Sequence, residues 1–279
     1  MNYLVFNPLA SNGTGVEKKQ IAVEALKDKF ADLKEINVLE TNNEEFVSNL
    51  QSDDVVILVG GDGTLNHLGN LVAGKNLKND FYLFKAGTGN DFLTDIEAKE
   101  DLVLINKYLE RLPKVIINGV ERYFINGIGF GIDGQVCVEA DKLKAKGAKK
   151  INYTGIAIKL LLTKYKCPNA IVKVDGEEFK LKKVWYASSM NGRYYGGGMM
   201  VAPSQDRLSG KLSFSSMYGS GRIKTLLVFS SIFKGEHIKH KKLVKLLEGK
   251  RIEVTFDRPT ALQIDGEVVE NVTTYVAEI

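Results

Sequence analysis

A glycine-rich turn follows one of the most apolar stretches of the sequence. Residues 55–59 are a continuous run of valine, isoleucine and leucine, typical of a strand buried on both faces of a parallel sheet. Glycines let a backbone approach a ligand closely, and the N–H groups of a turn that leads into a helix bind anions. We therefore predict a phosphate site here, although a plain tight turn fits the same residues. The turn reads Gly60-Gly61-Asp62-Gly63-Thr64.

The polar residues of this turn suggest specific roles. We expect Thr64 to cap a helix that begins near Leu65, and Asn66 to point back toward the turn. A carboxylate at Asp62 repels phosphates unless it acts through Mg²⁺ or orients a hydroxyl group. Asp62 is therefore a candidate for metal-assisted or acid–base chemistry.

Two further polar loops follow predicted strands in the same way. One contains Ser11 and Asn12, whose side chains supply hydrogen-bond donors. Ligands of open α/β sheets bind beyond the carboxyl ends of the strands, so we expect all three loops to converge on one ligand. The two loops are residues 7–13 and Gly87-Thr88-Gly89-Asn90-Asp91.

The elements that position these loops alternate between strands and helices in the first third of the chain. Such alternation is typical of a parallel sheet with helices on both faces. We expect strands at 3–6, 36–39, 54–59 and 81–85, and helices at 21–33, 46–50 and 65–72.

The pattern changes near residue 115. From there, short apolar runs recur between tight-turn pairs such as Asn118-Gly119 and Asp175-Gly176, as in antiparallel hairpins. Helical stretches interrupt these runs near 135–145, 152–166 and 222–232. We therefore predict an α/β domain at 1–115, a β-rich domain at 116–265 and a C-terminal segment at 266–279.

Composition excludes several classes of protein. The chain has 2 cysteines without a Cys-x-x-Cys pair and 3 histidines without nearby cysteines, so neither a disulfide scaffold nor a structural zinc site is expected. No apolar run approaches the roughly 18 residues that span a membrane. The first residues predict a strand rather than a signal peptide, and we expect a cytoplasmic protein.

Together, the motifs resemble those of the diacylglycerol kinase catalytic-domain family, which includes bacterial lipid kinases and sphingosine kinases. The Gly-Gly-Asp-Gly turn is shared with NAD kinases and phosphofructokinases, so the combination of motifs carries the specificity. The matching stretches are Asn7-Pro8 with Ser11, residues 60–66, residues 87–91, Arg122-Tyr123-Phe124-Ile125-Asn126, Gly235-Glu236-His237 and Asp265-Gly266-Glu267.

This resemblance implies a kinase that uses ATP and Mg²⁺ to phosphorylate a hydroxyl of diacylglycerol or a related lipid. It implies an N-terminal three-layer α/β domain with a parallel sheet, like that of NAD kinase and phosphofructokinase. A C-terminal antiparallel β-sandwich domain then shapes the lipid site, and residues 266–279 can return to the first domain. The positions matched to ATP binding are Asn7, Pro8, Leu9, Ala10, Ser11, Thr41, Gly60, Gly61, Asp62, Gly63, Thr64, Leu65, Asn66, Gly87, Thr88, Gly89, Asn90 and Asp91.

Three carboxylates are the catalytic candidates. Glu267 matches the family's catalytic base, Asp265 lies beside it, and Asp62 belongs to the phosphate turn. Phosphoryl transfer needs a positioned hydroxyl, Mg²⁺ to neutralise charge and a carboxylate that accepts the proton. Without the resemblance, residues 265–267 fit an ordinary hairpin turn.

Two stretches depart from the family pattern. Many bacterial members carry an aspartate just before the Arg-Tyr-Phe-Ile-Asn strand, whereas residues 114–119 contain no carboxylate. The Asp-Asp-Gly that holds a structural Mg²⁺ in some members is replaced by Leu208-Ser209-Gly210, which leaves Asp206 as the candidate metal ligand. Two alternatives therefore stay open: an NAD kinase-like enzyme with a soluble acceptor, and a catalytically weakened nucleotide-binding regulatory protein.

Residues 142–150 and 234–245 are rich in lysine. They are either solvated faces or a docking surface for anionic lipid, which would place the protein peripherally at the inner membrane face. Nucleic-acid binding fits less well, because the net charge is +4 and aromatic residues are not interleaved with the lysines. The sequence leaves the oligomeric state open, a homodimer included.

Overall fold

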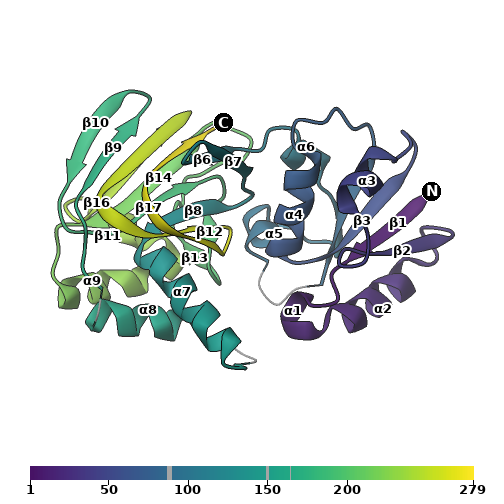
Figure 1. Ribbon diagram of the computed structural model, residues 1–279, viewed down its shortest axis with the longest axis horizontal. Helices are drawn as coiled ribbons and strands as arrows, with labels where there is room; N and C mark the ends of the chain where they lie inside the picture. The colour runs from purple at the N-terminus through teal and green to yellow at the C-terminus, as the bar shows by residue number, and fades with distance from the viewer. Residues whose placement is uncertain (87–89, 149–150, 164) are drawn as a thin grey trace. The chain divides into compact units, whose positions relative to one another are not determined.

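The computed structural model describes residues 1–86, 90–148, 151–163 and 165–279 (Figure 1). They divide into two compact units, unit 1 at Met1–Leu112 and unit 2 at Pro113–Ile279. Each unit builds its own sheet and is described by itself.

Unit 1 contains a five-stranded sheet in the order β2-β1-β3-β4-β5. Strands β1 to β4 are parallel, and β5 runs antiparallel to β4 at one edge. The strands are β1 (Asn2–Phe6), β2 (Leu33–Asn37), β3 (Val55–Gly60), β4 (Asp80–Lys85) and β5 (Leu102–Leu104). The helices are α1 (Ala10–Gly13), α2 (Gly15–Leu26), α3 (Asn43–Ser48), α4 (Asp62–Val72), α5 (Asp91–Asp95) and α6 (Asn106–Leu109).

Helices cover both faces of this sheet. Successive residues of a strand point to opposite sides, so each strand contributes side chains to both faces. On one face, β1, β3 and α2 form a shared core through Leu4, Phe6, Ile57, Val59, Ala22 and Leu26. On the other, Val5 and Leu58 lie near the apolar side chains Val47 of α3 and Leu68 of α4. The predicted three-layer α/β domain is confirmed.

The strand order creates a switch point between β1 and β3. From β1 the chain passes through α2 to β2 on one side, and then through α3 to β3 on the other side of β1. Connections that leave neighbouring strands in opposite directions open a crevice at the carboxyl ends, which is where open α/β sheets bind ligands. Residues 7–13 and 60–66 lie at this end.

Unit 2 is built on a ten-stranded antiparallel sheet in the order β15-β14-β11-β8-β16-β17-β6-β7, with the β9–β10 hairpin attached to β16. The strands are β6 (Lys114–Ile117), β7 (Val120–Tyr123), β8 (Gly127–Gly131), β9 (Ala170–Val174), β10 (Glu177–Leu181), β11 (Val184–Met190), β14 (Leu212–Tyr218), β15 (Val244–Gly249), β16 (Arg251–Ile264) and β17 (Glu267–Glu278). A small hairpin, β12 (Tyr194–Tyr195) and β13 (Met199–Met200), stands apart.

The long strand β16 belongs to two parts of this sheet. Residues 252–256 pair with β9, whereas residues 262–264 pair with β8. The sheet therefore bends around an apolar core that includes Phe130, Phe256 and Tyr275, whose rings pack together. The predicted antiparallel β domain is confirmed.

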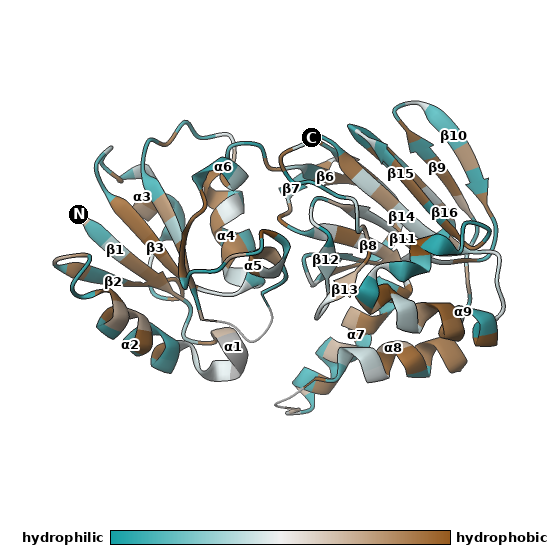
Figure 2. Ribbon diagram, turned by 180° about the vertical axis from the view of Figure 1, so that it is seen from behind, coloured by the Kyte–Doolittle hydropathy of each residue, from teal (hydrophilic) through white to brown (hydrophobic). Residues whose placement is uncertain are grey.

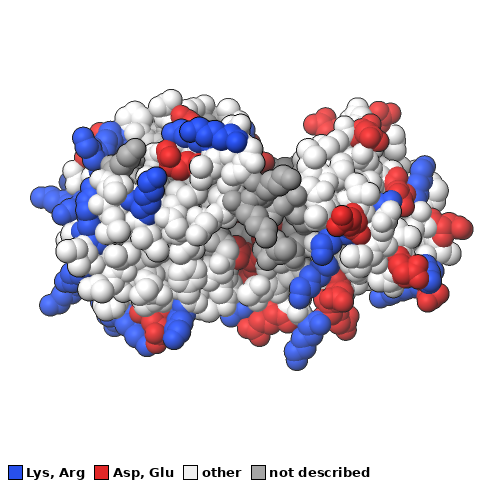
Figure 3. All heavy atoms as spheres, turned by 90° about the horizontal axis from the view of Figure 1, so that it is seen from below, with Lys and Arg blue, Asp and Glu red and all other residues white. Residues whose placement is uncertain are grey.

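Three helices pack on one side of the sheet of unit 2: α7 (Ile132–Ala145), α8 (Tyr153–Leu162) and α9 (Arg222–Phe229) (Figures 1 and 2). Two short 3-10 helices follow α9, η1 (Ser230–Lys234) and η2 (Glu236–Lys239). In the part of Figure 3 that unit 2 occupies, charged side chains are sparse toward the middle and basic ones gather near the edge.

The C-terminal segment differs from the expectation that residues 266–279 return to the first domain. Strand β17 pairs with β16 through a two-residue turn and with β6 along its other edge, so it lies in unit 2. The alternating buried positions Val272, Tyr275 and Ala277 complete the core of that unit. Among the described residues, no helix is long and apolar enough to cross a bilayer.

Candidate nucleotide-binding and catalytic sites

Three loops of unit 1 begin where neighbouring parallel strands end. Phe6 of β1 pairs with Val59 of β3, and Val59 pairs with Phe84 of β4. The loops that start at Asn7, Gly61 and Ala86 therefore leave the sheet next to one another, as the sequence predicts. The predicted residues Gly87, Thr88 and Gly89 lie outside the described residues.

The first loop is a short closed turn. The Oδ1 of Asn7 accepts a hydrogen bond from the N–H of Leu9 at 2.9 Å, and the Asn7 carbonyl accepts one from Ala10 at 3.0 Å. Gly15 packs against the same carbonyl so tightly that a Cβ at Gly15 would collide with it. Residues 7–10 are thus fixed between β1 and the start of α2. Pro8 lies inside this turn, and the side chain of Ser11 is not among those described.

The second loop leads into α4 earlier than expected. Helix α4 begins at Asp62 with Gly61 as its N-cap residue, so Thr64 lies inside the first turn and does not cap it. A Cβ on Gly60 would collide with the Thr64 side chain, which is buried beneath that glycine. The glycine pair brings the chain to the helix start directly, and Thr64 serves to pack the turn.

Gly63 contrasts with Gly60. A Cβ at Gly63 would meet no atom of the described residues outside its own helix turn within 4 Å, and the residue is exposed. The protein's own packing therefore leaves open space beside the first turn of α4. Backbone N–H groups in a first turn have no acceptor within their helix, and with the helix dipole they favour a bound anion.

Asp62 joins the second and third loops. Its Oδ2 accepts a hydrogen bond from the N–H of Asp91 at 2.9 Å, and its Oδ1 accepts one from Phe92 at 3.0 Å. Both donors lie at the start of α5, so the carboxylate holds the N-terminus of that helix beside α4. The Asp62 carboxylate is therefore a structural link within the predicted phosphate site.

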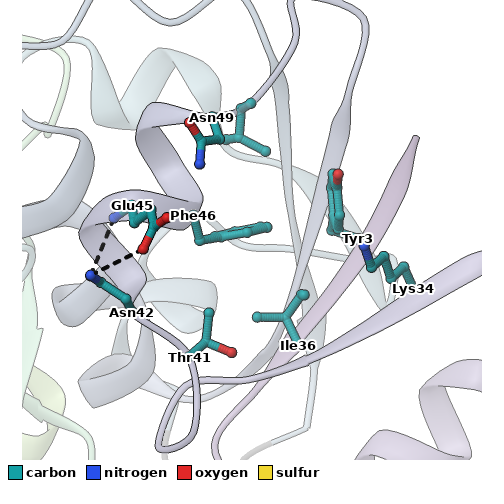
Figure 4. A pocket seen from close by; sticks show the side chains of 9 residues that line it. Tyr3, Lys34, Ile36, Thr41, Asn42, Glu45, Phe46 and Asn49 are labelled. Carbon is teal, nitrogen blue, oxygen red and sulfur yellow. Dashed lines mark hydrogen bonds between the residues drawn. The ribbon is translucent and has the colours of Figure 1, made fainter.

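Thr41 lines a pocket of about 240 Å³ between β2 and α3 (Figure 4). The ring of Phe46 forms one wall and meets the ring of Tyr3 edge-on, with centroids 5.1 Å apart. On the rim, the Asn42 side chain accepts a hydrogen bond from the N–H of Glu45 at 3.3 Å. The pocket thus combines apolar walls with polar groups at its edge.

The remaining matched positions of unit 1 divide between surface and core. Leu65 is completely buried and belongs to the packing of α4. The Oδ1 of Asn66 accepts a hydrogen bond from Asn70, one turn later, at 3.2 Å. Asn90 precedes α5 as its N-cap residue, and Asp91 is buried in the first turn of that helix.

In unit 2, the Asp265 side chain organises a distant segment. Its carboxylate accepts hydrogen bonds from three backbone N–H groups, those of Ile125, Asn126 and Gly127. Arg207 reinforces this segment by donating to the Ile125 carbonyl and to the Asn126 side chain. Asp265 therefore acts as a positioning group for the residues that end the Arg122–Asn126 motif.

Glu267 lies in a different environment, two residues away. Its side chain is 74% exposed, and its Oε2 lies 3.6 Å from the guanidinium of Arg122 on strand β7. This loose ion pair leaves the carboxylate open to solvent. Of the two predicted carboxylates in this turn, Glu267 is the more exposed one.

Asp206 closes its own turn. Its Oδ1 accepts a hydrogen bond from the N–H of Leu208 at 2.9 Å, and its carbonyl accepts one from the Ser209 hydroxyl at 2.7 Å. Within the described ranges, no group of three or more His, Cys, Asp or Glu side chains is placed to hold a metal ion. The structure therefore adds no partner ligand to this sequence-based candidate.

A carboxylate that the motifs did not identify is Asp133, at the start of α7. It accepts hydrogen bonds from the hydroxyls of Ser188 and Tyr195, and burial raises the pKa of its carboxyl from 3.8 to about 6 despite them. A Cβ on Gly129 would lie 2.7 Å from Asp133 Oδ2 and 2.8 Å from Gln263 Nε2, so this glycine makes room for both. The sequence feature that could have identified this carboxylate is the single aspartate in the stretch Gly131-Ile132-Asp133.

Gln263 connects this cluster to the Asp265–Glu267 turn. Its Oε1 accepts a hydrogen bond from the N–H of Gly266 at 2.8 Å. Gly266, the residue before Glu267, is therefore held by the side chain of Gln263, which lies in the interior of unit 2 near Asp133.

Comparison with known proteins places both units in one family. The diacylglycerol kinase catalytic domain model matches residues 2–118, and the YegS C-terminal NAD kinase beta sandwich-like domain model matches residues 126–278. A diacylglycerol kinase from Mycobacterium tuberculosis is 26% identical over 245 residues, which cover 83% of this chain and 78% of that protein.

Solved structures of low sequence identity share the fold. A diacylglycerol kinase from Bacillus anthracis aligns with a TM-score of 0.65 at 17% identity, over 99% of this chain and 93% of that one. Yeast NADH kinase in complex with NADH aligns with a TM-score of 0.52 at 11% identity, over 100% and 78%. With the family models covering nearly all of its residues, the chain belongs to the diacylglycerol kinase catalytic-domain family and is a kinase of the lipid kinase type.

Proposed function

We propose that this kinase transfers the γ-phosphate of ATP, with Mg²⁺, to a hydroxyl of diacylglycerol or a related lipid. The observation that carries the nucleotide part is the Asp62 carboxylate, which ties the start of α5 to the glycine turn at the switch point of the sheet. In this proposal the loops that follow β1 and β3, with the start of α5, supply backbone N–H groups to a triphosphate.

The open space beside Gly63 supports close approach of a phosphate to the first turn of α4. The pocket beside Thr41, with its aromatic wall, is suited to a planar ring such as a nucleotide base. In this proposal the base lies toward β2 and the phosphates lie between the loops that follow β1 and β3.

Mg²⁺ in kinases takes much of its coordination from phosphates and water, with one or two protein carboxylates. The described residues offer no closed metal cage, which is compatible with such an arrangement. Asp62 is the residue of this chain that would hold the ion, which would neutralise charge on the phosphates.

Glu267 is the proposed general base. Its exposed carboxylate accepts the proton of the lipid hydroxyl as that oxygen attacks the γ-phosphorus and the ADP oxygen leaves. Asp265 and Gln263 hold the turn that carries Glu267, through their bonds to residues 125–127 and to Gly266.

The test is an incubation of the purified protein with γ-labelled ATP and Mg²⁺ against diacylglycerol, sphingosine and NAD. We expect label in phosphatidic acid. Glu267→Gln is expected to lower the rate by about 10²–10⁴ while the Kd for ATP stays unchanged. Arg122→Gln, which removes only the ion-pair partner, is the matched control and should retain most of the activity.

Three results would contradict the proposal. Labelled NADP would support an NAD kinase-like enzyme, for which the likeness in fold to yeast NADH kinase provides a reason to test. ATP binding without any labelled product would support a regulatory protein, as the lack of a carboxylate in residues 114–119 suggests. A fully active Glu267→Gln variant would remove Glu267 from the reaction.

A further inference from the structure

The outer surfaces of α8 and α9 expose large apolar side chains at helical spacing. Ile158 and Leu162 stand one turn apart on α8, with exposed fractions of 36% and 47%. Ile223 and Leu227 stand one turn apart on α9 and are 75% and 71% exposed. Because residues i and i+4 share a helix face, each helix presents an apolar stripe away from its buried side.

The two helices are fixed to one another. Arg222, the first residue of α9, donates hydrogen bonds to the carbonyls of Leu161 and Tyr165 at 2.7 Å and 3.0 Å. These carbonyls lie at and just beyond the C-terminal turn of α8, where a cation is favoured by the helix dipole. The two helices that carry the stripes are therefore tied together within unit 2.

The two segments that carry this surface have charges of one sign. Residues 151–163 and 221–235 contain no Asp or Glu, and Lys159, Lys224 and Lys234 are exposed among them. Figure 3 shows the uncharged middle and the basic edge of unit 2 in this region. We call Ile158, Leu162, Ile223, Leu227 and Phe233, with the three lysines, the α8–α9 face.

Several lysines of the two lysine-rich segments identified from the sequence are paired with acidic side chains. On α7, Lys142 pairs with Glu139 at 2.9 Å and Lys144 pairs with Asp141 at 2.8 Å. In the second segment, Lys239 pairs with Glu236 at 2.5 Å. Ion pairs of this kind reduce the attraction of a surface for anions, so the α8–α9 face, whose two helices carry no Asp or Glu, is the better candidate for lipid contact.

We propose that the α8–α9 face docks this kinase on an anionic lipid bilayer. The apolar side chains enter the boundary between head groups and acyl chains, while the lysines contact anionic head groups. The inference rests on the proposed lipid substrate, which resides in such a bilayer. A second copy of the chain fits less well, because a two-fold contact through this face would bring the same basic edges together.

The experiment measures co-sedimentation of the full chain with two kinds of vesicle. One is phosphatidylcholine with about 30% phosphatidylglycerol, which gives a surface charge on the order of that of an anionic leaflet. The other is phosphatidylcholine alone. The variants are Ile223→Gln/Leu227→Gln and, separately, Lys159→Gln/Lys224→Gln. The matched control is Val120→Gln/Ile171→Gln, which changes two exposed apolar residues on the strands β7 and β9.

Binding to anionic vesicles is expected to fall at least tenfold in both α8–α9 variants and to stay unchanged in the control. Salt should weaken binding of the unaltered protein, and vesicles without phosphatidylglycerol should bind it poorly. Equal vesicle binding by all proteins would overturn the proposal. So would a loss of dimerisation, measured by light scattering, as the only effect of Ile223→Gln/Leu227→Gln.

A second readout separates this proposal from the proposed substrate. Phosphorylation of a short-chain diacylglycerol dispersed as monomers should be the same in the α8–α9 variants and the unaltered protein. Vesicle binding that depends on the face, without phosphorylation of any diacylglycerol, would retain the docking surface and refute the substrate. Phosphorylation of diacylglycerol without vesicle binding that depends on the face would support the substrate and refute the docking surface.

Discussion

The carboxylate of Asp265 accepts a hydrogen bond at 2.9 Å from the backbone N–H of Asn126, which lies 139 residues earlier in the chain. The same carboxylate satisfies the N–H groups of Ile125 and Gly127. Backbone donors in the interior of a protein destabilise it when they lose their acceptor. One side chain thus explains why the Arg122–Asn126 motif and the Asp265–Glu267 turn work as a unit.

Asp265→Asn should therefore lower the free energy of unfolding of unit 2, by about 2–3 kcal/mol. Asparagine tolerates the φ of 46° at this position, so the turn keeps its shape and loses only an acceptor oxygen and its charge. Urea unfolding followed by the fluorescence of Trp185, the single tryptophan, reports on this unit. The neighbouring exposed change Glu267→Gln is the control and should stay within about 0.5 kcal/mol.

Asp62→Asn should weaken nucleotide binding. An amide offers one acceptor oxygen, and its NH₂ group would face a backbone N–H at the start of α5, so one of the two bonds to Asp91 and Phe92 is lost. We expect the Kd for ATP, measured by calorimetry, to rise about tenfold. Asp53→Asn, an exposed aspartate before β3, should leave the Kd unchanged. Identical affinities in the two variants would mean that the link between the loops is dispensable.

Replacing Gly60 by alanine should affect mainly stability, whereas replacing Gly63 by alanine should affect mainly ATP binding. Gly60→Ala places a Cβ against the buried Thr64 side chain and should cost about 1–3 kcal/mol of stability. The methyl group of Gly63→Ala meets no atom of another described element and should leave stability within about 0.5 kcal/mol. It should nevertheless raise the Kd for ATP, because it enters the space left for phosphate. Thermal unfolding and calorimetry on both variants check this, and unchanged ATP binding by Gly63→Ala would argue against a phosphate there.

The loops of unit 1 could be predicted because their signals are local. The apolar run before Gly60 and the one before Ala86 each end in glycine-rich turns, and both became parallel strands with their loops at one edge. Capping chemistry favours threonine and so predicts a start of α4 near Leu65, three residues later than the observed start at Asp62. The structure uses Gly61 instead, and Thr64 is buried by long-range packing.

Strand β8 shows why other parts could not be predicted. Its sequence, Gly-Ile-Gly-Phe-Gly, has three residues with low strand propensity, but all five positions are buried in the sheet of unit 2. A Cβ on Gly127 would lie 2.6 Å from Met190 Sδ, so the glycines are selected by close neighbours on other strands. The Asp133 cluster escaped notice for the same reason, because its partners Ser188 and Tyr195 are distant in sequence.

Asp133→Asn should stabilise the protein at neutral pH. The folded-state pKa of this carboxyl is raised from 3.8 to about 6 by burial, so between these values the folded state holds a proton that the unfolded chain has lost. The contribution of this carboxyl to stability is therefore greatest at low pH and declines as pH rises toward 6, and above 6 its cost is constant. We expect a gain of roughly 1–2 kcal/mol for the variant at pH 7.5, allowing for the partial exposure of the site.

The measurement is urea unfolding of Asp133→Asn and the unaltered protein at pH 7.5 and pH 4. The gain should shrink at the lower pH, where the wild-type carboxyl is protonated in the folded state. Asp141→Asn, on the same helix but half-exposed and paired with Lys144, is the matched control and should show little difference between the two values. A gain that does not depend on pH would assign the effect to packing rather than to ionisation.

His237 should make the protein sensitive to acid. The side chain is completely buried, its Nε2 lies 3.2 Å from the Val201 carbonyl, and its Nδ1 has no hydrogen-bond partner among the described residues. Burial lowers the pKa of this imidazole from 6.5 to about 4, so below pH 6.5 the unfolded chain binds a proton that the folded state refuses. The stabilising contribution is complete above pH 6.5 and is lost as pH falls toward 4.

Between pH 7 and pH 5 this residue alone should cost about 2 kcal/mol of unfolding free energy. His237→Gln cannot be protonated and keeps an N–H donor for the Val201 carbonyl, so its stability should decline less over the same interval, even if it is lower at pH 7. The check is the difference in urea-unfolding free energy between pH 7 and pH 5, compared with that of His240→Gln, the exposed histidine three residues later. Equal declines in the two variants would show that the acid sensitivity comes from carboxylates elsewhere and not from this buried ring.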